Sequence, residues 1–351
     1  MSELFGKRLV AARKMASISL QELADKLNVG LNKQALSRME QGTQLPDSTQ
    51  LIDFANALNV TPDFFYTQNA NEVILKEVDY RKYVSKLNKT EESAVLQKVK
   101  ETLENYLEVA AILNMTIEVE SFEYKKHVKS YSDVEDAATA LRSQWNLGYG
   151  AVYSVVGMLE DKGYIVIDVE GPDAFDGLKA IFEHYRIIAL NKRKKNVRKR
   201  LTALHEVAHH NLIFDEALEE KDIEKLCHAF AAAVLYPKER FFQDIRKEGN
   251  FYINELIRLK AQWGISISAI FARAFNLEII NQNRYTFLNM NYRKRGYHLD
   301  EPGDYPVKEN TTRLEQMIQT ALKLDLISIN DAAHFTGTTV SEFRDTLKQF
   351  A

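Results

Sequence analysis

Residues 201–210 read LTALHEVAHH, and within them His205, Glu206 and His209 form the pattern His-Glu-x-x-His. Helical residues four positions apart lie on one face, so two imidazoles at this spacing can share one metal ion. Glu206 lies one step round the helix, where a carboxylate can act as general base towards the attacking water. The sequence therefore predicts a catalytic helix on which His205 and His209 bind Zn²⁺.

A catalytic zinc site keeps three protein ligands and one open position. Glu224 follows His209 by 15 residues, in a segment, Asp222–Leu235, whose apolar spacing predicts a second helix. We expect Glu224 to be the third ligand. His228 lies one turn further along the same face, where it would either bind the metal or support a ligand. His210 points about 100° away from His209 and is expected to be a surface or supporting residue.

The surrounding pattern predicts a fold that is mainly α with a small β-sheet (α+β). Helices are expected over 134–145 and 155–163, and strands over 164–169 and 185–190. A basic run, Lys192–Arg200, has seven Lys or Arg in nine residues. It is either a patch that holds phosphates or an acidic substrate, or a solvated loop between strand and helix.

Five short helical signals follow one another in residues 1–68. Ser19 and Glu22 form a capping box, and a short helix closed by Gly42 carries a polar face. Two short helices joined by a turn suit the major groove of DNA. The expected contacts are exposed polar side chains of the second helix and one residue at the start of the first: Lys33, Gln34, Ser37, Arg38 and Gln21. The competing interpretation is a small helical bundle with a solvated polar face.

Composition limits the class of protein. The 351 residues contain 46 Lys+Arg and 49 Asp+Glu, a formal charge of −3, so DNA contact must come from a local patch. The single cysteine, Cys227, excludes an internal disulfide framework and favours a reducing, cytoplasmic location. No run approaches about 18 apolar residues, so we expect no membrane segment.

Four regions are expected along the chain: 1–68 (DNA-binding), 69–130 (helical connector), 131–300 (metal-binding) and 301–351 (C-terminal, helical). Within the connector, apolar residues at a spacing of three and four predict one amphipathic helix of roughly 24 residues, about 36 Å long, over 90–113. It holds the first region away from the body, pairs with a partner helix, or packs on the next region. Residues 327–350 are interpreted as a second helix-turn-helix-like unit.

Two resemblances extend these predictions. The run QELADKLNVGLNKQALSRMEQG (21–42) resembles the Xre helix-turn-helix family, which implies binding to operator DNA as a homodimer. The phrases RKRLTALHEVAH (198–209) and IEKLCHAFAAAVLYP (223–237) resemble the ImmA/IrrE family of zinc metallopeptidases, as do FDGL (175–178) and the segment 259–270. This family implies a zincin-like metallopeptidase domain in which His205, His209 and Glu224 hold zinc and Glu206 is the base. Its usual Asn after the third ligand is His228 here.

The resemblance implies a zinc endopeptidase that cleaves a repressor or antitoxin-type regulatory protein in a stress, phage or mobile-element response. The alternative is a non-proteolytic Xre-type repressor or antitoxin whose peptidase-like domain senses a signal or binds a partner. A third interpretation is a scaffold in which the metal is structural. Tyr236 and His228 are considered as donors to the oxyanion of an enzymatic reaction, although the sequence does not choose between them.

Overall fold

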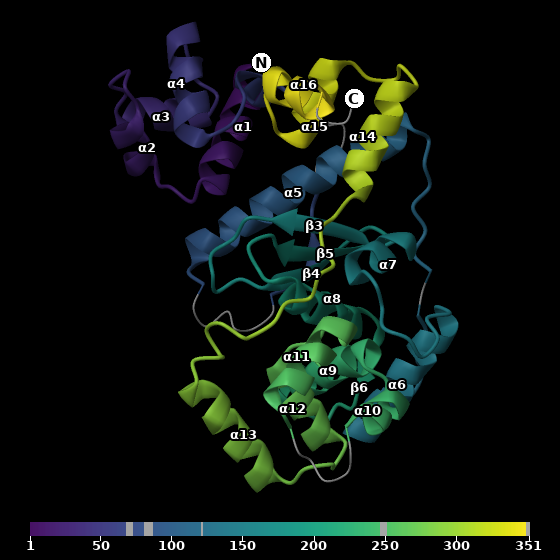
Figure 1. Ribbon diagram of the computed structural model, residues 1–351. Helices are drawn as coiled ribbons and strands as arrows, with labels where there is room; N and C mark the ends of the chain where they lie inside the picture. The colour runs from purple at the N-terminus through teal and green to yellow at the C-terminus, as the bar shows by residue number, and fades with distance from the viewer. Residues whose placement is uncertain (68–72, 81–86, 121, 246–250, 349–351) are drawn as a thin grey trace.

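The computed structural model describes residues 1–67, 73–80, 87–120, 122–245 and 251–348, and the fold is mixed α and β, as expected (Figure 1). The N-terminal part is helical throughout. Its elements are α1 (Ser2–Met15), α2 (Leu20–Lys26), α3 (Lys33–Glu40), α4 (Ser48–Leu58) and the 3₁₀ helix η1 (Pro62–Tyr66). The predicted capping box begins α2: Glu22 N–H donates to Ser19 Oγ, and Ser19 N–H donates to the Glu22 carboxylate. Its core consists of apolar side chains from all these elements.

A four-stranded sheet forms the centre of the remaining chain, with strand order β1-β4-β5-β3. The strands are β1 (Lys76–Tyr80), β3 (Ile165–Val169), β4 (Gly177–Phe182) and β5 (Tyr185–Asn191). β3 is parallel to β5, whereas β4 is antiparallel to both β5 and β1. β2 (His127–Val128) and β6 (Ile213–Phe214) form a separate parallel pair. The two strands predicted from the sequence are therefore present as β3 and β5.

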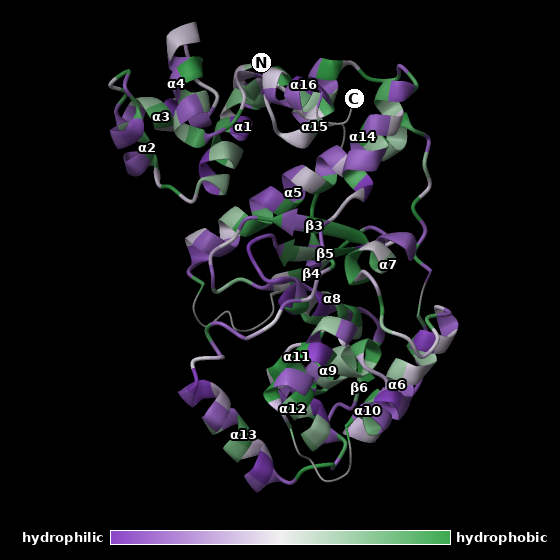
Figure 2. Ribbon diagram, in the orientation of Figure 1, coloured by the Kyte–Doolittle hydropathy of each residue, from purple (hydrophilic) through white to green (hydrophobic). Residues whose placement is uncertain are grey.

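Helices cover both faces of the sheet, which explains why β3 and β5 are hydrophobic on both sides (Figure 2). Along β3, Ile165 and Ile167 contribute to the core shared with α5 (Lys89–Ile112), while Val166 contributes to the core shared with α8 (Asn196–Asn211). In Figure 1, α5 crosses one side of the strands and α8 lies on the other. α8 therefore packs on one face of the sheet, against β4 and β5.

The region expected as a connector is part of this packing. Its long helix, α5, buries Val95, Val99 and Leu103 against the sheet and the C-terminal helices. α1 packs on the same helix, and Arg8 Nη1 lies 2.7 Å from Glu101 Oε2 in a mostly buried ion pair. Of the three interpretations of this helix, packing on the next region is therefore the observed one.

α8 packs on α9 (Glu220–Leu235), and further helices surround this pair or extend from it. They are α6 (Tyr131–Gln144), α7 (Val155–Asp161), α10 (Lys238–Asp244), α11 (Ile253–Trp263), α12 (Ile267–Asn276) and α13 (Gln282–Lys294). α7 packs on α8, α6 and α12 pack on α9, and α13 packs on α12. Within the described ranges, every helix is too short or too polar to span a lipid bilayer.

The C-terminal part contains α14 (Arg313–Lys323), α15 (Ile329–Thr336) and α16 (Val340–Lys348). α15 and α16 are joined by a turn at Gly337, whose φ of +67° is in the left-handed region that glycine adopts readily. α14 and α15 both pack on α5. Two short helices and a turn are thus present in the segment interpreted as helix-turn-helix-like, although residues 349–351 lie outside the described residues.

Both interpretations of the basic run 192–200 are wrong for its last residues. Lys199 and Arg200 lie within α8 and are almost fully buried. Lys199 Nζ lies 2.7 Å from Asp168 Oδ1, and Arg198 and Lys194 both pair with Asp176. Because the charges of Lys199 and Arg200 are matched inside the protein, the end of the run holds α8 in place. Residues 192–195 form the turn between β5 and α8, as the loop interpretation expected.

Candidate metal centre

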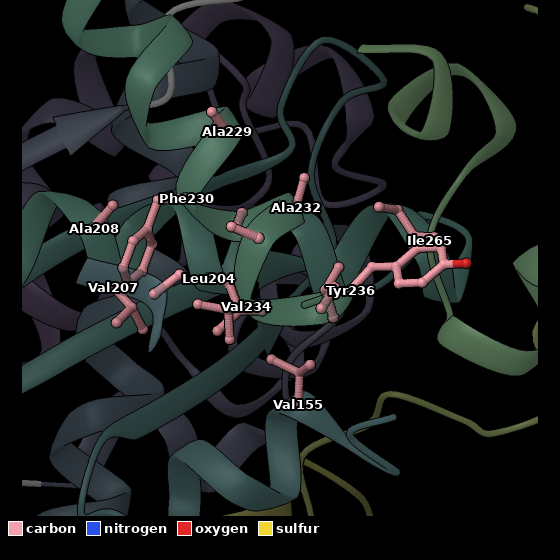
Figure 3. Packing of buried hydrophobic residues seen from close by; sticks show 14 of the residues in the cluster. Val155, Leu204, Val207, Ala208, Ala229, Phe230, Ala232, Val234, Tyr236 and Ile265 are labelled. Atoms are coloured by element: carbon pink, nitrogen blue, oxygen red, sulfur yellow. The ribbon is translucent and has the colours of Figure 1, made fainter. Parts of the chain in front are cut away.

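The site is built where α8 packs on α9. α9 carries four buried alanines (Ala229, Ala231, Ala232 and Ala233), whose small side chains allow neighbouring helices to approach closely, and alanine also favours helix formation. Figure 3 shows Leu204 and Val207 of α8 beside Phe230 of α9, in the core that holds both helices. This packing positions His205 and His209 of α8 opposite Glu224 of α9.

The three side chains converge on one point. His209 Nε2 lies 3.0 Å from His205 Nε2 and 3.1 Å from Glu224 Oε1. His205 Nε2 lies 3.4 Å from Glu224 Oε2. Among the described residues, these three form the group whose donor atoms all lie close enough together to hold one metal ion.

The donor set fits zinc. Ligands that are 2.0–2.1 Å from zinc at tetrahedral angles lie about 3.3 Å from one another, and the three observed separations are close to that value. Two imidazole nitrogens and one carboxylate oxygen are also ligands that zinc prefers in catalytic sites. His205 is fully buried, whereas the side chains of His209 and Glu224 are 12% and 24% exposed. The donors are therefore held at the end of a site that solvent can reach.

The electrostatics favour an ionised Glu224. Burial acts to raise the pKa of this carboxyl, but hydrogen bonds from His205 and His209 outweigh it and hold the pKa below its usual range. The carboxylate thus stays negatively charged, which is the form that binds a cation.

The other residues predicted for this site lie as follows. Glu206 is on α8 and is 1% exposed. The ring of His228 lies against the ring of His205, with centroids 4.4 Å apart, so it supports that imidazole by contact. His210 points to the sheet, where its Nε2 lies 3.2 Å from the Ile187 carbonyl oxygen, and burial lowers its pKa to about 3. Tyr236 is buried, and its hydroxyl donates to Asp244 at 2.7 Å.

The expected DNA contacts lie on one surface of the N-terminal helices. On α3, Lys33, Gln34 and Arg38 are exposed and Ser37 is half-buried, while Leu36 and Met39 face the core. Gln21 is exposed at the start of α2 and donates to Asp25. The turn between α2 and α3 is held by Asp53 of α4, which accepts hydrogen bonds from the backbone N–H groups of Asn28 and Val29.

Comparison with known families identifies both parts of the chain. Residues 9–65 match a family model described as helix-turn-helix, and residues 165–275 match one described as IrrE N-terminal-like domain. The chain therefore contains a region similar to a helix-turn-helix domain, followed by a region similar to an IrrE N-terminal-like domain. Both resemblances drawn from the sequence are confirmed, and the helix-turn-helix region implies DNA binding. The IrrE N-terminal-like region includes β3, β4, β5, α8 and α9, and hence all three donors.

Two curated relatives come from Bacillus subtilis (strain 168). The HTH-type transcriptional regulator ImmR is 34% identical over 90 residues, which are 26% of this chain and 64% of ImmR. The uncharacterized HTH-type transcriptional regulator YqaE is 31% identical over 74 residues, which are 21% of this chain and 62% of YqaE. The chain therefore spans less than two thirds of the length of these relatives.

Sequence reasoning missed β4 and its contacts with the helix that carries both histidines. A Cβ at Gly177, the first residue of β4, would lie 2.6 Å from Thr202 of α8, so glycine allows this close approach. Lys179 of β4 donates to the backbone carbonyl of His209 at 3.3 Å. The phrase FDGL contains that glycine and was the available signal, but nothing in it predicted a strand.

Proposed function

We propose that this protein is a DNA-binding regulator with a zinc-dependent endopeptidase domain that cleaves a repressor or antitoxin-type regulatory protein. The convergence of His205, His209 and Glu224 from two helices is the observation that carries the proposal. The match of residues 165–275 to an IrrE N-terminal-like model supports it, as does the helix-turn-helix match for the regulatory role.

In this proposal, His205, His209 and Glu224 would hold zinc. When bound, zinc would act as a Lewis acid that polarises a peptide carbonyl and lowers the pKa of water. Glu206 takes the proton from the attacking water and returns it to the nitrogen of the leaving amine. The ring of His228 keeps that of His205 in position. The surrounding core of α8 and α9 keeps the donors still during the reaction.

The test of this function begins with metal analysis of the purified chain, for which we expect about one zinc per chain. Wild type and Glu206→Gln are then compared in cleavage of the products of neighbouring genes. We expect Glu206→Gln to retain the metal and the fold but to lose cleavage, because the general base is gone. Glu216→Gln is the matched control, since Glu216 is exposed and precedes α9. Cleavage by Glu206→Gln at the wild-type rate would contradict the enzymatic role.

The relatives favour a second function, because both are named HTH-type transcriptional regulators. In that case the IrrE N-terminal-like region binds a partner or senses a signal without proteolysis. Operator binding would then be the only activity, and Glu206→Gln would leave both repression and its release unchanged. Release of repression that is lost with Glu206→Gln would favour the peptidase.

A further inference from the structure

The outer edge of the sheet next to the metal centre is covered by the chain's own β1. β1 comes from the segment between the helix-turn-helix region and the IrrE N-terminal-like region. It lies antiparallel to β4, with Lys76 opposite Ile181, Asp79 opposite Lys179 and Tyr80 opposite Leu178. β4 would otherwise present a row of unpaired backbone N–H and C=O groups, which is a template for another extended chain.

β4 is tied to the candidate catalytic helix by two specific contacts. Gly177 lies against Thr202, and Lys179 donates a hydrogen bond to the backbone carbonyl oxygen of His209. His209 is one of the three candidate metal ligands. An extended peptide that adds to the outer edge of β4 would therefore run alongside α8. Such strand addition binds a peptide through main-chain hydrogen bonds and keeps it extended.

The pairing of β1 with β4 is short and irregular. β1 has five residues, and the register shifts between Lys76 and Asp79. Within the shift, Glu77 has a φ of +48°, a left-handed conformation that a non-glycine residue adopts at a cost. Three of the five residues of β1 are charged, as is common in strands that discourage further pairing. These features make β1 easier to displace than a regular strand.

We propose that the outer edge of β4 is the docking edge for an extended segment of the substrate protein, and that β1 occupies this edge until the substrate displaces it. The proposal rests on the peptidase function proposed above. The substrate class is an unfolded or locally unfolded segment that pairs antiparallel with β4. Because β1 is tethered, its effective concentration is high and it competes with any added peptide.

β1 lies close in the sequence to the helix-turn-helix region, since the nine residues 67–75 separate η1 from β1. Removal of β1 from β4 would open the edge without a change in the metal donors themselves.

The test uses a fluorescently labelled peptide with the sequence of residues 73–80, VILKEVDY, as the probe. All proteins carry Glu206→Gln so that the peptide is not consumed. The double variant Asp79→Pro/Tyr80→Pro removes two backbone donors, one of which faces β4 in an antiparallel ladder. We expect this variant to bind the peptide roughly tenfold or more tightly than the parent, because the tethered competitor is lost. Ile74→Pro is the control, since Ile74 is exposed and precedes β1.

A disulfide lock provides a second measurement that does not depend on the proline variant folding. Lys76→Cys/Ile181→Cys joins residues that are directly opposite. With peptide at about 5 mM, comparable with the effective concentration of a tethered strand, we expect faster hydrogen exchange of residues 76–80 in the reduced protein. The oxidised protein should show no such change, and each single cysteine variant should behave as the reduced pair.

Equal peptide affinity in the parent and a folded proline variant, or no binding by either, overturns the proposal. So does β1 exchange that the peptide leaves unchanged in the reduced protein. These outcomes are independent of cleavage, because every protein in the test carries Glu206→Gln and therefore lacks the proposed general base. If the peptide displaces β1 but no protein is ever cleaved by the wild type, the docking edge stands and the peptidase function fails.

Discussion

Arg200 and Glu309 lie 109 residues apart in the sequence and form an ion pair in which both side chains are fully buried. Glu309 also accepts hydrogen bonds from the backbone N–H groups of Val155 and Val156, at the first turn of α7. Arg200 lies five residues before His205 on α8. The C-terminal segment is therefore bound to the helix that carries the candidate metal ligands His205 and His209.

Glu309→Gln should destabilise the protein by about 3–5 kcal/mol, because removing one partner leaves a buried charge without compensation. The free energy of unfolding from urea titration measures this effect. Asp300→Asn is the control: its partner Lys195 is 54% exposed and Asp300 is 88% exposed, so the loss should be much smaller than for Glu309→Gln. Equal losses of unfolding free energy for the two variants would show that the buried ion pair contributes no more stability than the exposed one.

Asp53 makes the free energy of unfolding of the helix-turn-helix region depend on pH in the acid range. Burial acts to raise the pKa of Asp53, but hydrogen bonds from Asn28 and Val29 outweigh it and hold the pKa below its ordinary value of 3.8. A depressed folded pKa contributes stability above the unfolded value, and this contribution is lost as the pH falls through the folded pKa.

Asp53→Asn should therefore lower stability at neutral pH and flatten its pH dependence below about pH 4. The expected loss at neutral pH is about 1–3 kcal/mol, since the substitution removes the negative charge and leaves one acceptor oxygen for the three N–H donors of Asn28 and Val29. Thermal unfolding followed between about pH 2 and pH 6 measures both effects. Asp25→Asn, at an exposed position of α2, serves as the control, and an identical pH profile for the two variants would refute the assignment.

Glu224→Gln should weaken zinc binding on the order of 100-fold or more, because it replaces a charged ligand of a three-ligand site. Competition with a chromophoric chelator measures this affinity. Circular dichroism should show the same helix content as the wild type, since Glu224 is only half-buried. Glu216→Gln should bind zinc as the wild type does. Unchanged affinity in Glu224→Gln would remove this residue from the donor set.

Arg38→Ala should weaken binding to DNA from upstream of the protein's own gene by about 1–3 kcal/mol, roughly 5- to 150-fold, if Arg38 contacts a base edge. An electrophoretic or anisotropy titration at fixed salt measures the change. Lys125→Ala removes one equally charged, highly exposed side chain outside the helix-turn-helix region. A loss of the same size in both variants would point to general charge and not to recognition by α3.

Local patterns in the sequence predicted the parts of the fold that depend on neighbouring residues. The spacing of His205 and His209 was enough to place both imidazoles on one face, because helix geometry alone decides it. The capping box of Ser19 and Glu22 likewise depends on residues three apart. Strand β5 could be found because it is a short apolar run with β-branched residues.

Longer-range features could not be read in this way. The separation of 3.1 Å between His209 Nε2 and Glu224 Oε1 results from the packing of α8 on α9. The basic run seemed suited to solvent or phosphate because its acidic partners, such as Asp168 and Glu309, are distant in the sequence. β1 was missed because three of its five residues are charged, and β4 because Gly177 and Lys179 interrupt its apolar run.

The amino-acid sequence by itself determined the helices, their capping and the chemistry of the metal donors, since these follow from residue types a few positions apart. Only the tertiary structure decided which charges are buried in pairs, which strand covers the edge beside α8, and that three donors meet within reach of one ion. The physical reason is that burial and close approach depend on which distant segments pack together, and local patterns carry no record of that choice.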